Sequence, residues 1–334
     1  MTASKTKLTT RPLTKNDFDT VVKIDSKITG RERPGFFQKR LQAALEEPKH
    51  FLYIGCELDG ELKGFLMGRL LQGEYGLNKP FAVIDVLDVD PESQGSGLGR
   101  ALGQAFGALL ESKNIDEVRS QADWRNHSIL RFFEKTGFQL SPRHILEREV
   151  SYMSTNTIDE PEYDDAELNE IDFSDEEGDQ VGALARDSVY CRSLQADDLD
   201  TLIRIDRKIG NTDRSAYYER KVKEAMEETG IRVSLVAEIK GMVVGFVMAR
   251  VDYGEFDRTE PIAVLDTIGV DPGFAHLHVG RALLSQLLGN LATLRLDKVR
   301  TEIGAEQIDL KAFLMSNDFY TAQHLTFNCN EFRY

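Results

Sequence analysis

The chain contains the same sequence pattern twice, with matching positions 181 residues apart. Val89-Asp90-Pro91 recurs as Val270-Asp271-Pro272, and Gly99-Arg100-Ala101-Leu102 recurs as Gly280-Arg281-Ala282-Leu283. Because this offset holds almost without gaps, the two copies are predicted to share one fold. A length of 334 residues also suits two domains of about 150 residues better than one.

Between the copies lies a strongly acidic segment. We expect a first domain over residues 1–153, a linker over 154–189 and a second domain over 190–334. Within the linker, Asp159–Asp179 holds twelve acidic residues and no lysine or arginine. It has few aromatic residues and no clear periodicity, which predicts a disordered or loosely held tether. Regulation by contact with a charged partner is the alternative hypothesis for this segment.

The overall composition excludes several classes of protein. The net charge is −15, but it is only −3 without the acidic stretch, so the chain lacks the basic footprint of a nucleic-acid-binding protein. No apolar run reaches the ~18 residues of a membrane span, and the first residues lack the apolar core of a signal peptide. The three cysteines are too scattered for a disulfide framework or a zinc site. We therefore expect a cytoplasmic protein with no metal, nucleic-acid or membrane partner.

The hydrophobic pattern predicts a mixed sheet with helices in each copy. The order is strand, helix, helix, three strands, helix, strand, helix and closing strands. Asp59-Gly60 is typical of a hairpin turn, and Gly137 is expected to end a helix. In the first copy, strands are predicted near 8–12, 51–57, 62–71, 81–89, 118–122, 138 and 145–153. One helix is predicted to begin at residues 14–17, a second to cover 34–45, a third to run from the glycine-rich loop to about 111, and a fourth to cover 128–135.

A glycine-rich loop joins the apolar strand Phe81–Val89 to a helical pattern. Gly95, Gly97 and Gly99 allow positive φ and close approach of a ligand to the backbone. The first N–H groups of the helix have no internal partner and lie at its positive end, which favours a phosphate or diphosphate. A Walker loop is excluded because no Lys-Ser/Thr pair follows, and a dinucleotide loop is excluded because Arg100 stands where its third glycine belongs.

The loop resembles the diphosphate loop of the GNAT (GCN5-related N-acetyltransferase) superfamily, V-x-P-x-x-Q/R-x-x-G-x-G/A. A second segment, Asn126–Phe138, is similar to that superfamily's N-x-x-A-x-x-F/L-Y-x-K-x-G-F helix. The resemblance implies an α/β (α+β) mixed-sheet fold in each copy, a fused pseudo-dimer within a monomeric chain, and acetyl-CoA or another acyl-CoA as cofactor. The residues it implies in cofactor binding are Leu87, Asp88, Val89, Gln94, Gly95, Ser96, Gly97, Leu98, Gly99, Arg100, Asn126 and Phe133.

The second copy departs from both family segments. Gln94, Gly95 and Gly97 are replaced by Ala275, His276 and His278, and the second segment loses its asparagine and its glycine. An imidazole at the position of Gly97 adds bulk where phosphates are expected, and it adds strain of about 1–3 kcal/mol if φ is positive there. Two histidines without a third ligand fall short of a zinc site. The first copy is therefore predicted to hold the cofactor.

Two acidic residues are candidate catalytic groups. The resemblance implies transfer of the acyl group to a primary amine, with the acyl carbonyl held by a distorted stretch at Leu87–Val89. Asp85 is expected on the same strand face as Leu87 and Val89, where it would act as general base or amine anchor. Its recurrence as Asp266 favours a structural role instead. Glu74, in the loop before this strand, is the second candidate.

Three functional hypotheses remain open at this point. The leading one is an N-acyltransferase active in the first copy, with a small-molecule or peptide amine as acceptor. Because Phe133 replaces the family's tyrosine, which can protonate the departing thiolate, a CoA-binding pseudoenzyme acting as sensor or scaffold is the alternative. The third places the active site in the second copy with another acyl donor. Trp124, the single tryptophan, is expected to pack in the core or at its rim.

Overall fold

The computed structural model describes residues 7–71, 79–150, 189–227, 233–252, 260–330 and 332. The helices and strands of the first half are β1 (Leu8–Pro12), α1 (Phe18–Thr29), α2 (Pro34–Glu46), β2 (Phe51–Leu58), β3 (Glu61–Leu71), β4 (Phe81–Val89), α3 (Leu98–Ser112), β5 (Val118–Asp123), α4 (His127–Lys135), β6 (Gln139–Leu140) and β7 (Arg143–Glu149). Those of the second half are β8 (Tyr190–Ser193), α6 (Leu199–Gly210), α7 (Ser215–Glu227), β9 (Leu235–Ile239), β10 (Met242–Asp252), β11 (Ile262–Val270), α8 (Val279–Thr293), β12 (Lys298–Gly304), α9 (Ile308–Met315), β13 (Tyr320–Thr321) and β14 (His324–Cys329). The acidic stretch Asp159–Asp179 lies outside the described residues.

Local sequence signals account for several element ends. Asp59 and Gly60 both have positive φ and form the tight turn between β2 and β3. Gly30 ends α1 in the left-handed conformation, and Pro34 occupies the first turn of α2. Gly137 has a φ of 83° just beyond α4, as expected for a helix stop.

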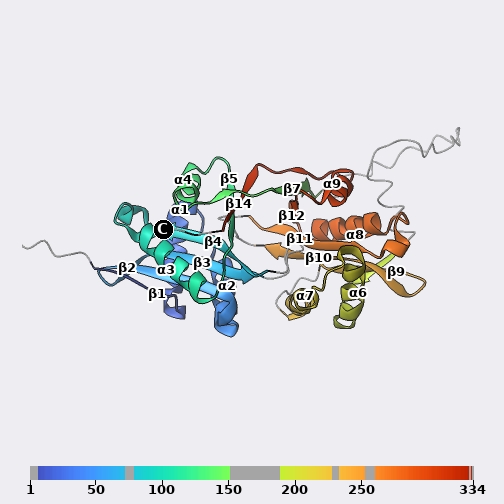
Figure 1. Cartoon of the computed structure of the whole chain (residues 1–334), viewed down its shortest axis with the longest axis horizontal. Coiled ribbons are helices and arrows are strands. Elements are labelled where there is room, and N and C mark those ends of the chain that lie inside the picture. Colours follow the sequence, from blue (N-terminus) through green and yellow to red (C-terminus); the bar gives the residue numbers. More distant parts are fainter. Residues whose placement is uncertain are drawn as a thin grey trace, which may run out of the picture.

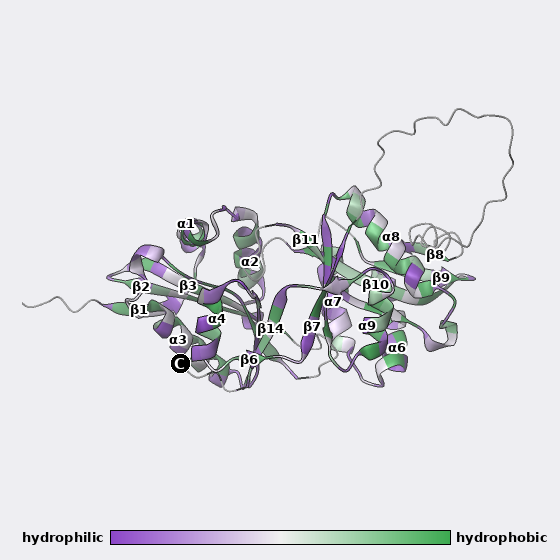
Figure 2. Ribbon diagram, turned by 90° about the horizontal axis from the view of Figure 1, so that it is seen from above, coloured by the Kyte–Doolittle hydropathy of each residue, from purple (hydrophilic) through white to green (hydrophobic). Residues whose placement is uncertain are grey.

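Each half of the molecule is built on one mixed sheet, and the two halves lie side by side along the long axis (Figure 1). Among the described residues each sheet has seven strands, in the orders β1-β2-β3-β4-β5-β14-β6 and β13-β7-β12-β11-β10-β9-β8. This architecture confirms the predicted α/β fold in two similar halves. In the first half, α1 and α2 cover one face of the sheet, where Phe36 and Phe37 pack on Phe65. On the other face, α3 and α4 contribute Phe106 and Phe133 to the core. Figure 2 shows the hydrophobic residues of these strands and helices.

Each half gives one strand to the other half's sheet. The first half's β7 pairs antiparallel with β12, and β14 near the end of the chain pairs antiparallel with β5. Figure 1 shows the green β7 reaching into the second half and the dark red β14 into the first. The expectation that strands near 145–153 close the first domain was therefore wrong. A strand's own pattern predicts that it is a strand, but its pairing partner is chosen by the tertiary fold. The domain limits 1–153 and 190–334 stay a prediction.

The exchanged strands meet at a polar seam with approximate two-fold symmetry. Gln121 Nε2 donates to Glu302 Oε2 at 2.7 Å, and these two residues are 181 positions apart. Equivalent residues can contact each other only near a two-fold axis. Arg143 Nε also donates to Glu302, at 2.5 Å, and Arg300 forms a buried ion pair with Glu147. The axis of the pseudo-dimer therefore passes close to this seam.

A substitution at Phe327, in β14, tests whether this strand belongs to the sheet of the first half. The Phe327 ring lies 4.8 Å from that of Phe133, so Phe327→Ala should open a void in the core of the first half. We expect a loss of about 3 kcal/mol in the free energy of unfolding, with faster amide exchange in α3 and α4. Both quantities are measurable by denaturant titration and hydrogen-exchange mass spectrometry.

Phe319→Ala is the matched control, because Phe319 is buried in the core of the second half. It should accelerate exchange in α8 rather than in α3. If Phe327→Ala instead loosened only α8 and α9, β14 would belong to the second sheet.

Candidate active site

The parallel strands β4 and β5 pair at only two positions, Ala82–Val118 and Val83–Arg119, near their amino ends. Among the described residues they form no further pair toward their carboxyl ends, and this unpaired interval is called the opening below. Just beyond the second pair the Ser120 hydroxyl donates to the Ile84 carbonyl at 3.0 Å. On its other side, β4 remains paired with β3 as far as Val89. Beyond the second pair, the side of β4 that faces β5 therefore has no strand partner among the described residues.

A β-bulge displaces Asp85 from the regular alternation of β4. Met67 of β3 pairs with Val86 and Gly68 pairs with Ile84, so Asp85 is the extra residue. Leu87 and Val89 pack against the core under α3 and α4, whereas Asp85 bonds Arg69 on the other face. The prediction that Asp85 shares the face of Leu87 and Val89 was therefore wrong. The distortion also lies at Asp85 rather than at Leu87–Val89, whose residues pair regularly with β3.

The glycine loop has a backbone suited to a bound anion. Gly95 and Gly97 have φ of 84° and 89°, and Gly97 is the N-cap of α3. A Cβ atom placed on either glycine would have no described heavy atom within 4 Å, apart from its chain neighbours, so the space in front of them is open. Asp90 fixes the start of the loop by accepting from Lys27 Nζ at 3.0 Å and from the Glu92 amide at 3.2 Å.

The corresponding loop of the second half has the same backbone but different side chains. His276 and His278 have φ of 63° and 56°, and His278 is the N-cap of α8. Asp271 accepts from Lys208 at 2.7 Å, as Asp90 does from Lys27. Positive φ at a non-glycine residue carries strain, so the second half keeps the conformation at a cost while carrying two exposed histidines in the loop.

The other predicted cofactor residues lie at the end of β4, in the loop that follows it, and on α3 and α4. Leu87, Asp88 and Val89 form the end of β4, and Gln94–Arg100 form the loop and the first turn of α3. Asn126 caps α4, its Oδ1 accepting from the Ile129 amide at 3.3 Å. Phe133 is fully buried against Phe138 and Phe327, which gives it a packing role. Its contact with the cofactor stays a prediction.

Asp85 forms an ion pair with Arg69. Its two carboxylate oxygens accept from Nε and Nη2 of Arg69 at 2.6 and 2.8 Å, and its side chain is 1% exposed. This bidentate pairing occupies both oxygens, so the geometry suits a group that orients Arg69. Its counterpart Asp266 accepts from Arg250 Nε at a longer distance of 3.3 Å and also lies 3.5 Å from Lys221 Nζ. The second candidate, Glu74, lies outside the described residues.

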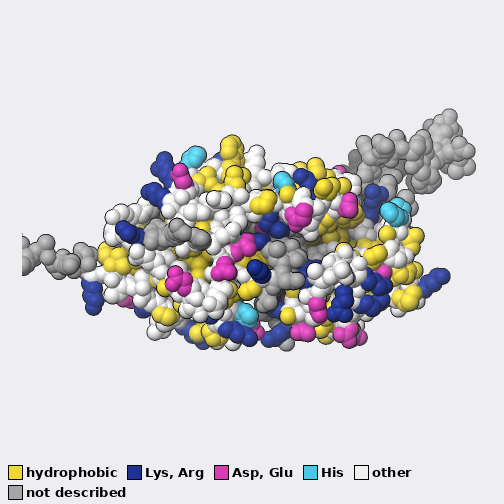
Figure 3. Space-filling model, in the orientation of Figure 1, with side chains coloured by type: hydrophobic (Ala, Val, Ile, Leu, Met, Phe, Trp, Pro, Cys, Tyr) yellow, Lys and Arg dark blue, Asp and Glu magenta, His cyan; other side chains and the backbone are white. Residues whose placement is uncertain are grey.

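Arg69 also lines a cavity of about 560 Å³ between the two halves. Its walls come from equivalent elements of the two halves, α2 and β3 on one side and α7 and β10 on the other. Lys39, Arg40, Arg220, Lys221, Glu224 and Asp266 are among its lining residues. Figure 3 shows charged side chains of both signs near the middle of the molecule. The sequence alone did not reveal this cavity, because its residues come together only when the halves pack.

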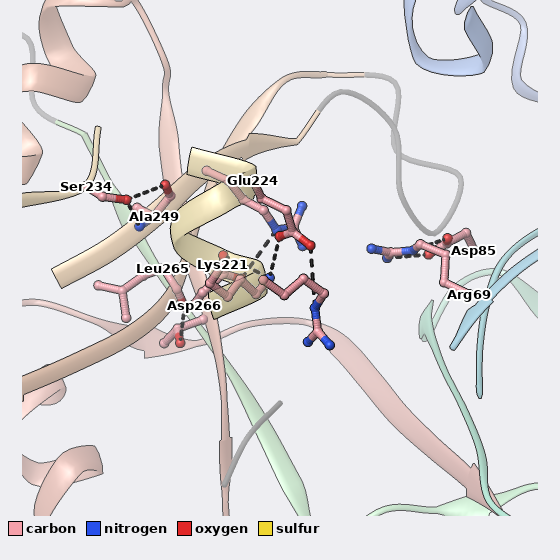
Figure 4. A network of polar contacts seen from close by, with 11 residues as sticks. Arg69, Asp85, Lys221, Glu224, Ser234, Ala249, Leu265 and Asp266 are labelled. Carbon is pink, nitrogen blue, oxygen red and sulfur yellow. Dashed lines mark hydrogen bonds and ion pairs between the residues drawn. The ribbon is translucent and has the colours of Figure 1, made fainter. Parts of the chain in front are cut away.

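The wall formed by the second half carries a charged network (Figure 4). Lys221 Nζ lies 3.4 Å from the Glu224 carboxylate and 3.5 Å from that of Asp266. The charges of Lys221, Arg220 and Arg250 lower the pKa of the Glu224 carboxyl more than burial raises it. In the first half Ala43 occupies the position of Glu224, 181 residues earlier, so the cavity is not symmetric in charge.

Comparison with known proteins shows the family. The sequence matches the acetyltransferase (GNAT) family over residues 18–138 and 199–317, so the chain belongs to that family and contains its domain twice. It is 35% identical over 101 residues to a mycothiol acetyltransferase of Thermobispora bispora, a match covering 30% of this chain and 34% of that protein. The aligned region thus spans only about a third of this relative.

Two solved structures share the whole fold. One is a tandem GNAT protein from the clavulanic acid biosynthesis pathway, with a TM-score of 0.62, 12% identity and coverage of 97% of this chain and 98% of that one. The other is a fungal multi-domain β-N-acetylglucosaminidase with a glucosamine N-acetyltransferase region, with a TM-score of 0.64, 13% identity and coverage of 97% and 38%. In the part of the chain that the structure describes, no helix is both long and apolar enough to cross a bilayer.

The lowered pKa of Glu224 predicts how the free energy of unfolding depends on pH. Since its pKa is lowered in the folded state, its contribution to stability is present above the ordinary value of 4.5 and is lost as the pH falls through the folded value. Glu224→Gln should therefore flatten the acid limb of a plot of unfolding free energy against pH.

Glu219→Gln, on the exposed side of the same helix, is the control and should leave that limb unchanged. Equal slopes for wild type and Glu224→Gln would contradict the lowered pKa.

Proposed function

We propose that the chain is an acyl-CoA-dependent N-acyltransferase whose first half binds the cofactor. The observation that carries this proposal is the contrast between two loops of the same backbone shape. Gly95 and Gly97 leave open space before the N-terminus of α3, where His276 and His278 place imidazoles before α8. A diphosphate fits the first loop, because its amides and the helix terminus are accessible to an anion. This is also where the family resemblance placed it.

The residues of the first half have distinct roles in this proposal. The backbone of Gln94–Arg100 binds the diphosphate, and the opening between β4 and β5 receives the pantetheine arm. Bound there, an acyl-CoA supplies an activated thioester. Beyond Ile84, where β4 pairs with no described strand on its β5 side, its backbone amides would stabilise the negative charge that develops on the acyl carbonyl. Asp85 holds Arg69 at the wall of the central cavity.

The central cavity is proposed to receive the amine acceptor. A volume of about 560 Å³ lies within the range of small-molecule sites. Its carboxylates, Glu224 and Asp266, can attract an ammonium group, and its cationic residues and Arg69 can bind anionic or hydroxyl groups. The names of the curated relatives, mycothiol acetyltransferases, support transfer to a small-molecule amine.

A CoA-binding pseudoenzyme is the second candidate, and two observations favour it. Phe133 has no hydroxyl and is buried in an aromatic cluster, so it cannot protonate a departing thiolate. Asp85 has both oxygens engaged by Arg69, which leaves it poorly placed to accept a proton from an amine. In this alternative the first half binds CoA but no acyl group is transferred.

Binding is tested by isothermal titration with acetyl-CoA. We expect one site per chain, lost in Gly97→His because the imidazole fills the diphosphate position. The variant should fold, since His278 occupies the same left-handed conformation in the second half. The double variant His276→Gly/His278→Gly is the control and should leave binding at the first site unchanged. Two equal sites in the wild type, or none, would overturn the assignment.

Turnover is tested by release of free CoA thiol across a panel of primary amines. The enzyme proposal predicts release that depends on the amine, and Asp85→Asn should lower it at least tenfold through loss of the Arg69 pairing. Thermal unfolding of the variant shows whether the effect is merely loss of fold. Binding of acetyl-CoA without amine-dependent release across the panel would favour the pseudoenzyme.

A further inference from the structure

Trp124 lies directly beyond β5, the strand on one side of the opening. It follows β5 as the glycine loop follows β4, and the last pair between the two strands is Val83–Arg119. Trp124 is 52% exposed, so of the two expected places, the core and its rim, the core is excluded. Exposure of an apolar side chain does not by itself indicate a binding role, because other apolar residues, such as Ile308 at 70%, are more exposed than Trp124.

The orientation of the indole follows from the ladder between β5 and β14. Val118 and Ala122 belong to the core under α3 and α4, and Trp124 continues their alternation. The ladder itself ends at Asp123–His324, and one residue beyond it the Trp124 amide donates to the Gln323 carbonyl at 3.5 Å. Its Nε1 also donates to the Gln323 side chain, at 3.4 Å. Extending the alternation of β5 by one residue assigns the indole to the α3 and α4 face, the face on which the glycine loop begins α3.

The second half lacks this residue. The position 181 residues after Trp124 is Ala305, which follows β12 as Trp124 follows β5. The half with the open glycine loop thus carries the aromatic side chain, and the half with histidines in that loop does not. This correlation is independent of the loop's own geometry.

We propose that Trp124 is a cofactor-binding residue whose indole packs on the pantetheine arm where that arm enters the opening. The inference rests on the proposed binding of acyl-CoA by the first half. With the diphosphate at the end of β4, the first group that passes between the strands is the branched, apolar pantoate. An exposed indole across the mouth offers this group a flat apolar surface. Gln323, from the second half, holds the ring in place.

The chain's single tryptophan makes the test direct, because its fluorescence reports this position alone. Titration with acetyl-CoA should change the emission with the dissociation constant found by calorimetry. Pantetheine at high concentration should produce the same change, and adenosine 3′,5′-diphosphate should not. A response to the nucleotide and not to pantetheine would overturn the assignment to the pantetheine arm.

Calorimetry on variants supplies the second arm of the experiment. Trp124→Ala should weaken acetyl-CoA binding about five- to tenfold through lost apolar contact. Trp124→Phe should retain most of the affinity, and Tyr190→Ala, an exposed aromatic in the second half, should match the wild type. Should Trp124→Ala fail to fold, the phenylalanine variant and the fluorescence titration still decide.

The outcomes separate this inference from the proposed function. Calorimetric binding with unchanged fluorescence, or with equal affinity in Trp124→Ala, overturns the role of Trp124 and leaves acyl-CoA binding intact. Absence of calorimetric binding by the wild type overturns both.

Discussion

Pairing of β14 with β5 is the interaction on which the arrangement of the molecule depends. The last strand of the chain lies in the sheet of the first half, from His324 beside Asp123 to Cys329 beside Val118. It brings Phe327 into the cluster around Phe133, and Phe332 beyond it packs on Phe106. Since β7 makes the reciprocal exchange, neither core closes without the other half. This coupling holds the halves in the register that forms the central cavity.

Duplication has kept the backbone and changed the chemistry. Both loops after the central strands take the same left-handed turns, and both are fixed to the first helix by an Asp–Lys pair. Only the first has glycines at those turns. In the second loop, positive φ at each histidine costs about 1–3 kcal/mol of strain. The conformation persists because the surrounding structure fixes it. The two loops therefore share a backbone conformation and differ in the side chains they present.

The bulge at Asp85 links the opening to the cavity. It turns the carboxylate away from the face of Leu87 and toward Arg69, whose side chain lines the cavity between the halves. A buried carboxylate is tolerated when its charge and hydrogen bonds are matched, and the bidentate guanidinium provides both. The second half repeats the bulge at Asp266, which also pairs with the equivalent arginine, Arg250, so the arrangement is part of the fold. The position of Asp85 beside Arg69 is therefore set by a bulge that both halves of the fold contain.

The sequence alone determined the duplication, the order of helices and strands, and the contrast between the two loops. Those features follow from local chemistry, namely the spacing of apolar residues, glycines at strained turns, and a constant offset of 181. The face on which Asp85 lies was missed because a bulge arises from pairing with β3, not from the sequence of β4. The exposure of Trp124, the exchange of β7 and β14 and the cavity beside Arg69 were likewise decided by the tertiary structure. Each depends on contacts between residues far apart in the chain, which period and composition do not encode.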